Sequence, residues 1–277
     1  MVFHEILKLL IREVLKGIIG EEAIEHEVRL TLAYKIPDII INYVKVPNVP
    51  RGSWLYYVLS GKYKKRIIEI QNPYQPTKQE KIIQVIDYMM VASAKYNMNL
   101  RDILGVLICP SLPTEKLPEF IEKVRGFKAE VISEDLIKSV ITKTGDEELM
   151  RIRIIEIDKL QPNVDYNEIL LIFSKDIIIS RRAHRIIARK YDPGSLIYFW
   201  GYWLMPEEYP RGPELPDRTV AEAIRKIGIE KVSRALKLLG LEEFIKTIGL
   251  RDIMRALVKI YGKDKIVEEI ENADKES

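Results

Sequence analysis

Residues 65–71, Lys-Arg-Ile-Ile-Glu-Ile-Gln, decide the fold together with residues 35–41, Lys-Ile-Pro-Asp-Ile-Ile-Ile. Both segments are rich in β-branched residues and are bounded by charges or turn signals, as buried strands are. Residues two apart in a strand share a face, so Glu69 and Gln71 point the same way. A carboxylate is costly to bury alone, and two neighbouring carboxylates repel unless a cation joins them. Asp38 and Glu69 are therefore candidate ligands of Mg²⁺ or Mn²⁺, which suit an all-oxygen site.

The neighbouring segments predict an alternation of helices and strands, which indicates an α/β fold. Apolar periodicity and turn signals place these elements, in chain order, as a helix over 3–19, a strand over 24–32, a helix opened by a Thr77/Glu80 capping box and running to Tyr96, a strand over 103–109, a helix over 114–125, a strand over 129–132 and a short helix from Ser133. A first domain is predicted to end near residue 143, before an acidic break.

This order resembles the PD-(D/E)xK nuclease superfamily, whose shared core runs helix, three strands, helix, strand, with its acids on the second and third strands. The resemblance covers roughly the first 110 residues and implies a restriction-endonuclease-like core. It also implies that Asp38, Glu69 and the backbone carbonyl of Ile70 hold one or two divalent ions for hydrolysis of a DNA phosphodiester. Where the family usually has Lys, this chain has Gln71, as do active Rpn-type members; Lys81 in the next helix is a candidate replacement cation.

Two further motifs of the superfamily have counterparts here. Gln84 and Tyr88 match the Gln-x-x-x-Tyr pattern of RecB-like members and share a helical stripe with Lys81, which makes them candidates for nucleic-acid binding. Members of the archaeal Holliday-junction-resolvase type use a glutamate of the first helix, for which Glu13 fits better than Glu5 because it lies at the polar/apolar boundary. The alternatives are the ordinary polar face of an amphipathic helix and a surface acid.

Basic and aromatic residues gather in two places. Residues 47–61 carry Trp54, Tyr56 and Tyr57 between Arg51 and a basic run over 62–66, which suits an exposed loop that stacks bases near the site, or aromatics packed beneath a hairpin. In an intermediate segment, residues 144–216, the nucleic-acid-binding candidates Arg181, Arg185 and Arg189 recur every four residues. That helical face suits phosphates or, alternatively, nearby acids. Residues 168–190 read as a strand plus a helix or as one long helix.

Composition, charge and cysteine content limit the classes of protein to which the chain can belong. The 277 residues, 47% hydrophobic and 31% charged, predict a globular chain. Because 44 basic and 41 acidic residues nearly balance, any nucleic-acid surface must come from local clustering. The single cysteine, Cys109, excludes an internal disulfide and most zinc sites. Neither a signal peptide nor a transmembrane run is evident, so a cytoplasmic protein is expected. Abundant Ile, Lys and Glu fit the trend of heat-adapted organisms.

The pattern of residues 217–277 predicts a C-terminal region of short helices that end at glycines. We expect this region to serve in packing, homo-oligomer formation or partner docking. The function predicted from the sequence is a metal-dependent DNA nuclease. The alternatives are a catalytically degenerate nuclease fold that binds DNA or a protein, and an interaction protein that works through its C-terminal helices.

Overall fold

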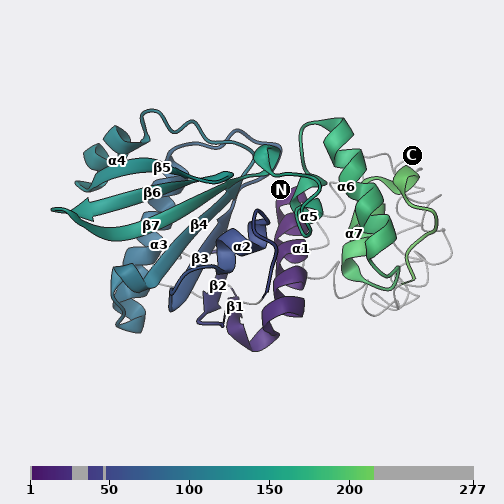
Figure 1. Ribbon diagram of the computed structural model, residues 1–277, viewed down its shortest axis with the longest axis horizontal. Helices are drawn as coiled ribbons and strands as arrows, with labels where there is room; N and C mark the ends of the chain where they lie inside the picture. The colour runs from purple at the N-terminus through teal and green to yellow at the C-terminus, as the bar shows by residue number, and fades with distance from the viewer. Residues whose placement is uncertain (1, 27–36, 46–47, 215–277) are drawn as a thin grey trace, which may run out of the picture. The chain divides into compact units, whose positions relative to one another are not determined.

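The computed structural model describes residues 2–26, 37–45 and 48–214, and Figure 1 shows a mixed β-sheet flanked by helices. The predicted α/β class is confirmed. Residues Phe3–Glu214 form one compact unit. The helices predicted over 217–277 lie outside the described residues.

The sheet has seven strands in the order β1-β2-β3-β4-β7-β6-β5. Along the chain they are β1 (Ile24–His26), β2 (Ile39–Asn42), β3 (Lys65–Ile70), β4 (Ile103–Cys109), β5 (Lys128–Glu134), β6 (Ile137–Thr144) and β7 (Glu147–Glu156). Neighbouring strands are antiparallel except at the centre, where β4 lies parallel to both β3 and β7. Strand β7 belongs to the segment beyond the predicted boundary at residue 143, and the sheet continues across that boundary.

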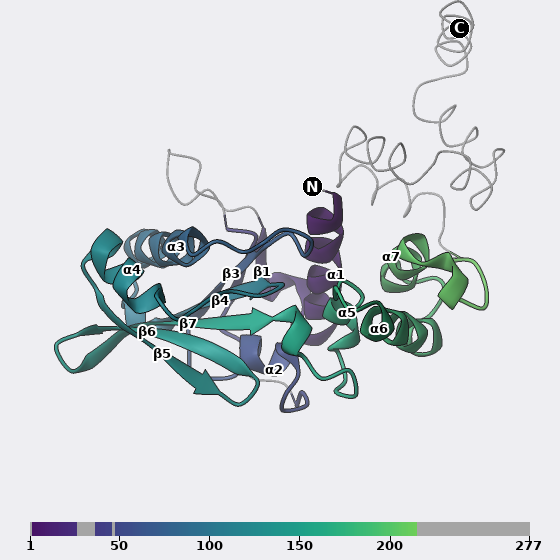
Figure 2. The ribbon, with the colours of Figure 1, turned by 90° about the horizontal axis from the view of Figure 1, so that it is seen from above.

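The helices are α1 (Val2–Ile19), α2 (Trp54–Leu59), α3 (Glu80–Tyr96), α4 (Leu117–Arg125), α5 (Glu168–Leu171), α6 (Ile177–Lys190) and α7 (Leu196–Leu204). Helices α3 and α4 cover one face of the sheet, and α2 lies on the other (Figure 2). Apolar residues of β3, β4 and β7 form the core beneath α3, including Ile67, Leu107 and Ile154. Gly105 of β4 permits the close approach of α3, because an added Cβ would lie 2.7 Å from Val85 Cγ1.

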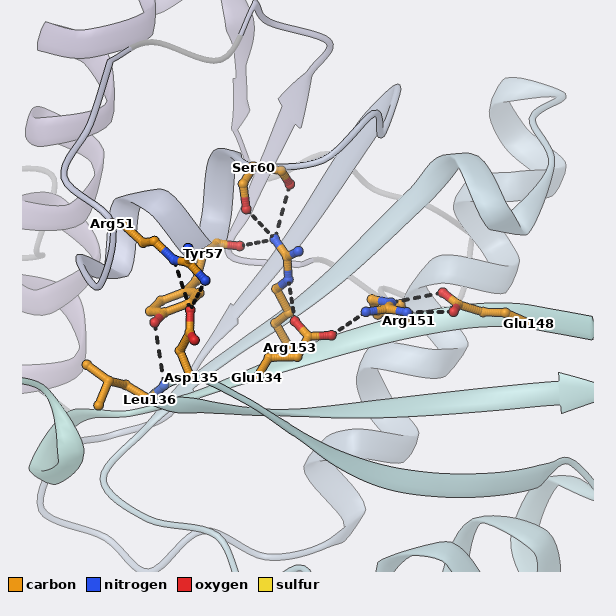
Figure 3. Close-up of polar contacts among 9 residues, drawn as sticks. All are labelled: Arg51, Tyr57, Ser60, Glu134, Asp135, Leu136, Glu148, Arg151 and Arg153. Atoms are coloured by element: carbon orange, nitrogen blue, oxygen red, sulfur yellow. Dashed lines mark hydrogen bonds and ion pairs between the residues drawn. The ribbon is translucent and has the colours of Figure 1, made fainter.

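Helix α2 occupies the insertion for which the sequence predicts an exposed loop. Ser53 caps it by accepting a hydrogen bond from the Tyr56 N–H. Trp54 and Tyr57 are buried, so the base-stacking role is wrong for these two residues. Arg153 of β7 donates to the carbonyls of Tyr57 and Ser60 and so fastens the end of α2 to the sheet (Figure 3).

Two local predictions are corrected by the structure. The helix predicted from Ser133 is a β-hairpin, because β5 turns at Asp135, which has a φ of 53°, and β6 then pairs with both β5 and β7. Thr77 and Glu80 form no capping box. Helix α3 begins at Glu80, Thr77 is buried, and the residue at the N-cap, Gln79, makes no side-chain capping bond.

The segment 168–190 is neither a strand plus a helix nor one long helix. It contains the short α5 and the longer α6, which begins where Asp176 accepts hydrogen bonds from the N–H groups of Ile178 and Ile179. His184 of α6 is buried against Tyr209, with 3.1 Å between its Nδ1 and the phenol oxygen. Burial lowers the pKa of His184 to about 4.

We expect His184 to make the fold sensitive to acid. Between pH 6.5 and 4 the unfolded chain binds a proton at this residue and the folded chain does not, so stability is lost as the pH falls through this window. The loss amounts to about 2.5 kcal/mol at pH 4.5. Urea unfolding at pH 7 and pH 4.5 should show this loss in the wild type in excess of that in His184→Gln. An equal loss in both proteins would contradict the assignment.

Candidate functional site

The two predicted acids lie opposite each other on neighbouring strands. The antiparallel register pairs Ile39 of β2 with Ile68 of β3, and one step further places Asp38 opposite Glu69. The Ile70 N–H donates to Asp38 Oδ2 at 2.8 Å, which ties the two strands together at this point. The structure therefore brings together the three groups that the sequence selects as ligands.

Helix α1 adds two cations that sequence reasoning missed. Lys8 Nζ lies 3.0 Å from Asp38 Oδ1, and His4 Nε2 lies 3.5 Å from Asp38 Oδ2. The same His4 nitrogen donates to the Ile70 carbonyl at 2.8 Å. His4 and Lys8 are four residues apart on one helical face, which is the only sequence signal of the pair.

These contacts set the protonation of both partners. Burial disfavours the charge of Asp38, but His4 and Lys8 outweigh burial, so the pKa of Asp38 lies below its ordinary value. Burial would likewise lower the pKa of His4, yet its contacts with Asp38 and Glu5 raise it to about 9. At neutral pH this part of the site is therefore an ion pair rather than a neutral hydrogen bond.

Glu69 has a different environment. It is buried on the face of β3 that packs against α3, and Lys81 Nζ lies 2.9 Å from its Oε1. Burial and the negative charge of Asp38 raise the pKa of Glu69 to about 7, against the opposing effect of Lys81. The charge of Asp38 is thus close enough to disfavour the ionisation of Glu69.

The predicted stripe on α3 forms a chain of hydrogen bonds that leads away from Glu69. Lys81 Nζ also donates to Gln84 Oε1 at 2.9 Å, and Gln84 Nε2 donates to the Tyr88 hydroxyl. Tyr88 is buried, and burial raises its pKa to about 12. The stripe therefore positions Lys81 and does not supply a second acid or base.

Gln71 follows the end of β3 and extends its parallel pairing, because its N–H donates to the Ile108 carbonyl at 2.8 Å. It is half-buried and shares a face with Glu69. A neutral amide there can orient a ligand by hydrogen bonding but adds no charge.

Glu13 is not brought to this cluster. It lies nine residues beyond His4 on α1, or about 14 Å along the helix axis. The acid of α1 that does approach the cluster is Glu5, whose carboxylate lies 3.6 Å from His4 Nδ1 and 3.8 Å from Lys8 Nζ. The choice of Glu13 over Glu5 follows from amphipathicity alone, whereas the crossing of α1 over the end of β3 favours the first turns of the helix.

The arginines of α6 engage an acid. Arg185 Nε lies 2.5 Å from Glu208 Oε2 and Arg181 Nε lies 3.5 Å from Glu208 Oε1. Arg189 is exposed. These contacts favour the solvated face with a nearby acid over a dedicated phosphate surface.

A divalent ion at this site would rest on few protein ligands. Among the described residues, no group of three or more His, Cys, Asp or Glu side chains is placed to hold a metal ion. The donor set is Asp38, Glu69 and the carbonyl of Ile70, all oxygen, and a cation would offset the burial and the charge of Asp38 that raise the pKa of Glu69. Mg²⁺ commonly takes one or two carboxylates and completes its shell with water and substrate, so these residues fit it.

Comparison of the chain with protein-family models, with curated proteins and with solved structures found no match in any of the three. In the part of the chain that the structure describes, no helix combines the length and the apolar character that crossing a membrane requires.

Proposed function

We propose that the chain is a metal-dependent DNA nuclease of the PD-(D/E)xK type, with Asp38 and Glu69 as its central acids. The order of elements supports this proposal. Helix α1, the antiparallel strands β1, β2 and β3, helix α3 and the parallel strand β4 follow one another as the resemblance implies for a restriction-endonuclease-like core. Helix α2 is an insertion between the two strands that carry the acids.

The observation that carries the proposal is the convergence of the buried carboxylate of Glu69 and the partly buried carboxylate of Asp38 with one backbone carbonyl at the end of β3. Asp38 comes from the start of β2 and Glu69 from β3, so the pairing of the two strands holds them together. A structural role alone gives no reason to place Glu69 beside the charge of Asp38, because burial and that charge make the ionised form of Glu69 costly. In a metal site, the bound cation offsets this electrostatic cost.

Asp38, Glu69 and the Ile70 carbonyl would hold Mg²⁺ or Mn²⁺, which when bound polarises a phosphodiester and makes water a better nucleophile. Lys81 stands beside Glu69 and supplies the positive charge that Gln71 lacks. Gln84 and Tyr88 keep the Lys81 ammonium in place. Gln71 is placed to hydrogen-bond the attacking water or the scissile phosphate.

A specific observation favours a second candidate function. His4 and Lys8 already offset the charge of Asp38, and Lys81 offsets that of Glu69, so the cluster is nearly neutral or positive as it stands. A degenerate nuclease fold that binds DNA, or a protein partner, would retain this basic surrounding without needing a metal ion.

Calorimetric titration of the full chain with Mn²⁺ distinguishes the two. We expect binding to the wild type, and a loss of affinity of at least tenfold in Asp38→Asn and Glu69→Gln, because each removes a ligand charge. Asp102→Asn is the matched control, since Asp102 pairs with Lys64 away from the cluster and should bind as the wild type does.

Wild-type protein that binds DNA but gives no Mn²⁺ signal would contradict the nuclease and favour the binding module. Absence of both Mn²⁺ and DNA binding would favour the interaction protein.

A further inference from the structure

A second cluster of lysines surrounds a buried carboxylate at the end of β7. Glu156 is 4% exposed and accepts a hydrogen bond from the Leu112 N–H at 3.0 Å. Lys159 Nζ lies 2.6 Å and Lys138 Nζ 3.8 Å from Glu156 Oε2. Lys138 also donates to Thr114 Oγ1 at 2.8 Å. Two ammonium groups are therefore held around one carboxylate, which leaves the cluster positive.

Sheet register relates this cluster to the proposed nuclease site. Glu69 of β3 pairs with Leu107 of β4, Leu107 pairs with Ile154 of β7, and Ile154 pairs with Lys138 of β6. Paired residues share a face, so Glu69 and Lys138 lie in one row across four strands, on the face that packs against α3. Three strand spacings separate their backbones by about 14 Å.

Both ends of this row combine a buried carboxylate with a lysine that reaches solvent. Side-chain exposure is 30% for Lys81 beside Glu69, and 24% and 51% for Lys138 and Lys159 beside Glu156. The carboxylates fix the positions of the ammonium groups, and the exposure leaves these groups accessible to an anion. A polyanion lying along this edge would meet positive charge at two separated points.

Cys109 lies between the two clusters, and its environment argues against thiol chemistry at this edge of the sheet. Cys109 of β4 pairs with Glu156, and its thiol is fully buried. Burial and the charge of Glu156 raise the pKa of Cys109 to about 12, so it is neither a nucleophile nor a thiolate ligand at neutral pH. What the second cluster offers a ligand is its lysines.

We propose that Lys138 and Lys159 bind a backbone phosphate of the DNA strand whose scissile phosphate lies at Asp38 and Glu69. The DNA strand then crosses the carboxyl ends of β3, β4 and β7. This inference rests on the proposed function, because it takes its substrate from there. Phosphate contacts of this kind position a nucleic acid without reading its sequence.

The test measures DNA binding in EDTA, where no metal-dependent cleavage takes place. Fluorescence anisotropy with a labelled single-stranded oligonucleotide gives the affinity of the full chain over a NaCl series. For Lys138→Gln/Lys159→Gln we expect the slope of log K against log salt to fall by about 1.4, and the affinity at 0.1 M NaCl to fall about 20-fold. The matched control is Lys128→Gln/Lys143→Gln, whose residues lie opposite each other in the strand register, at the end of the β5–β6 hairpin away from its turn. It should bind as the wild type does.

Two further variants guard against an effect of misfolding. Lys138→Arg/Lys159→Arg keeps both charges and should keep the affinity. Lys159→Gln changes one half-exposed side chain and should lower the slope by about 0.7. Affinity and slope equal to those of the control pair, or an arginine variant as weak as the glutamine variant, would overturn the inference.

The proposed nuclease activity is tested separately, and the absence of DNA cleavage with Mg²⁺ or Mn²⁺ would contradict it. A wild-type chain that does not bind the oligonucleotide would overturn the inference alone, since the proposed function is overturned only by the absence of cleavage.

Discussion

Replacing Arg66 by methionine is expected to destabilise the fold by about 4 kcal/mol. Arg66 is fully buried in β3, on the face opposite Glu69. Its guanidinium donates to the carbonyls of Val58, Leu59, Gly61 and Tyr63 at distances from 2.6 to 3.2 Å. Burial and the nearby charge of Arg153 lower its pKa to about 10, so it remains charged at neutral pH.

The expected loss of stability comes from the carbonyls that accept hydrogen bonds from Arg66. Val58 and Leu59 end the six-residue helix α2, whose last carbonyls have no partner within the helix. Methionine fills much of the same space but leaves these buried acceptors without a donor and removes the cation from the helix C-terminus. Urea unfolding of Arg66→Met measures the loss, with the exposed Arg182→Met as its control. A change within 1 kcal/mol of the control would show that water replaces the guanidinium without cost.

The strands that carry the site are predictable from the sequence because their signals are local. A run of β-branched residues between charged ends identifies β3, and the period of two then places Glu69 on a known face. The stripe of Lys81, Gln84 and Tyr88 is equally local, since helical spacing alone puts these side chains beside one another.

The rest of the site depends on contacts between distant segments. His4 and Lys8 meet Asp38 only because α1 crosses the ends of β2 and β3, and no spacing within α1 reveals this crossing. The aromatic residues of α2 are read as an exposed loop because Pro and Gly flank them, whereas tertiary packing buries Trp54 and Tyr57. The β5–β6 hairpin likewise depends on pairing with β7, which cannot be predicted from local strand propensity.

Loss of DNA cleavage in Asp38→Asn is the largest effect that we expect. Asparagine keeps the size of the side chain, and its amide oxygen can still accept a hydrogen bond from the Ile70 N–H. It removes one of the two charges that would hold a divalent ion, so the rate should fall by about three orders of magnitude or more. Asp102→Asn should cleave at the wild-type rate, because Asp102 pairs with Lys64 outside the cluster.

The central claim is that Asp38 and Glu69 form a metal-dependent nuclease centre. It is tested most directly by incubating wild type, Asp38→Asn and Asp102→Asn with labelled single-stranded, duplex and four-way-junction DNA in Mg²⁺ or Mn²⁺. We predict metal-dependent cleavage of at least one substrate by the wild type and by Asp102→Asn, and none by Asp38→Asn. Full cleavage by folded Asp38→Asn, or no cleavage of any of the three substrates by the folded wild type, would contradict the claim.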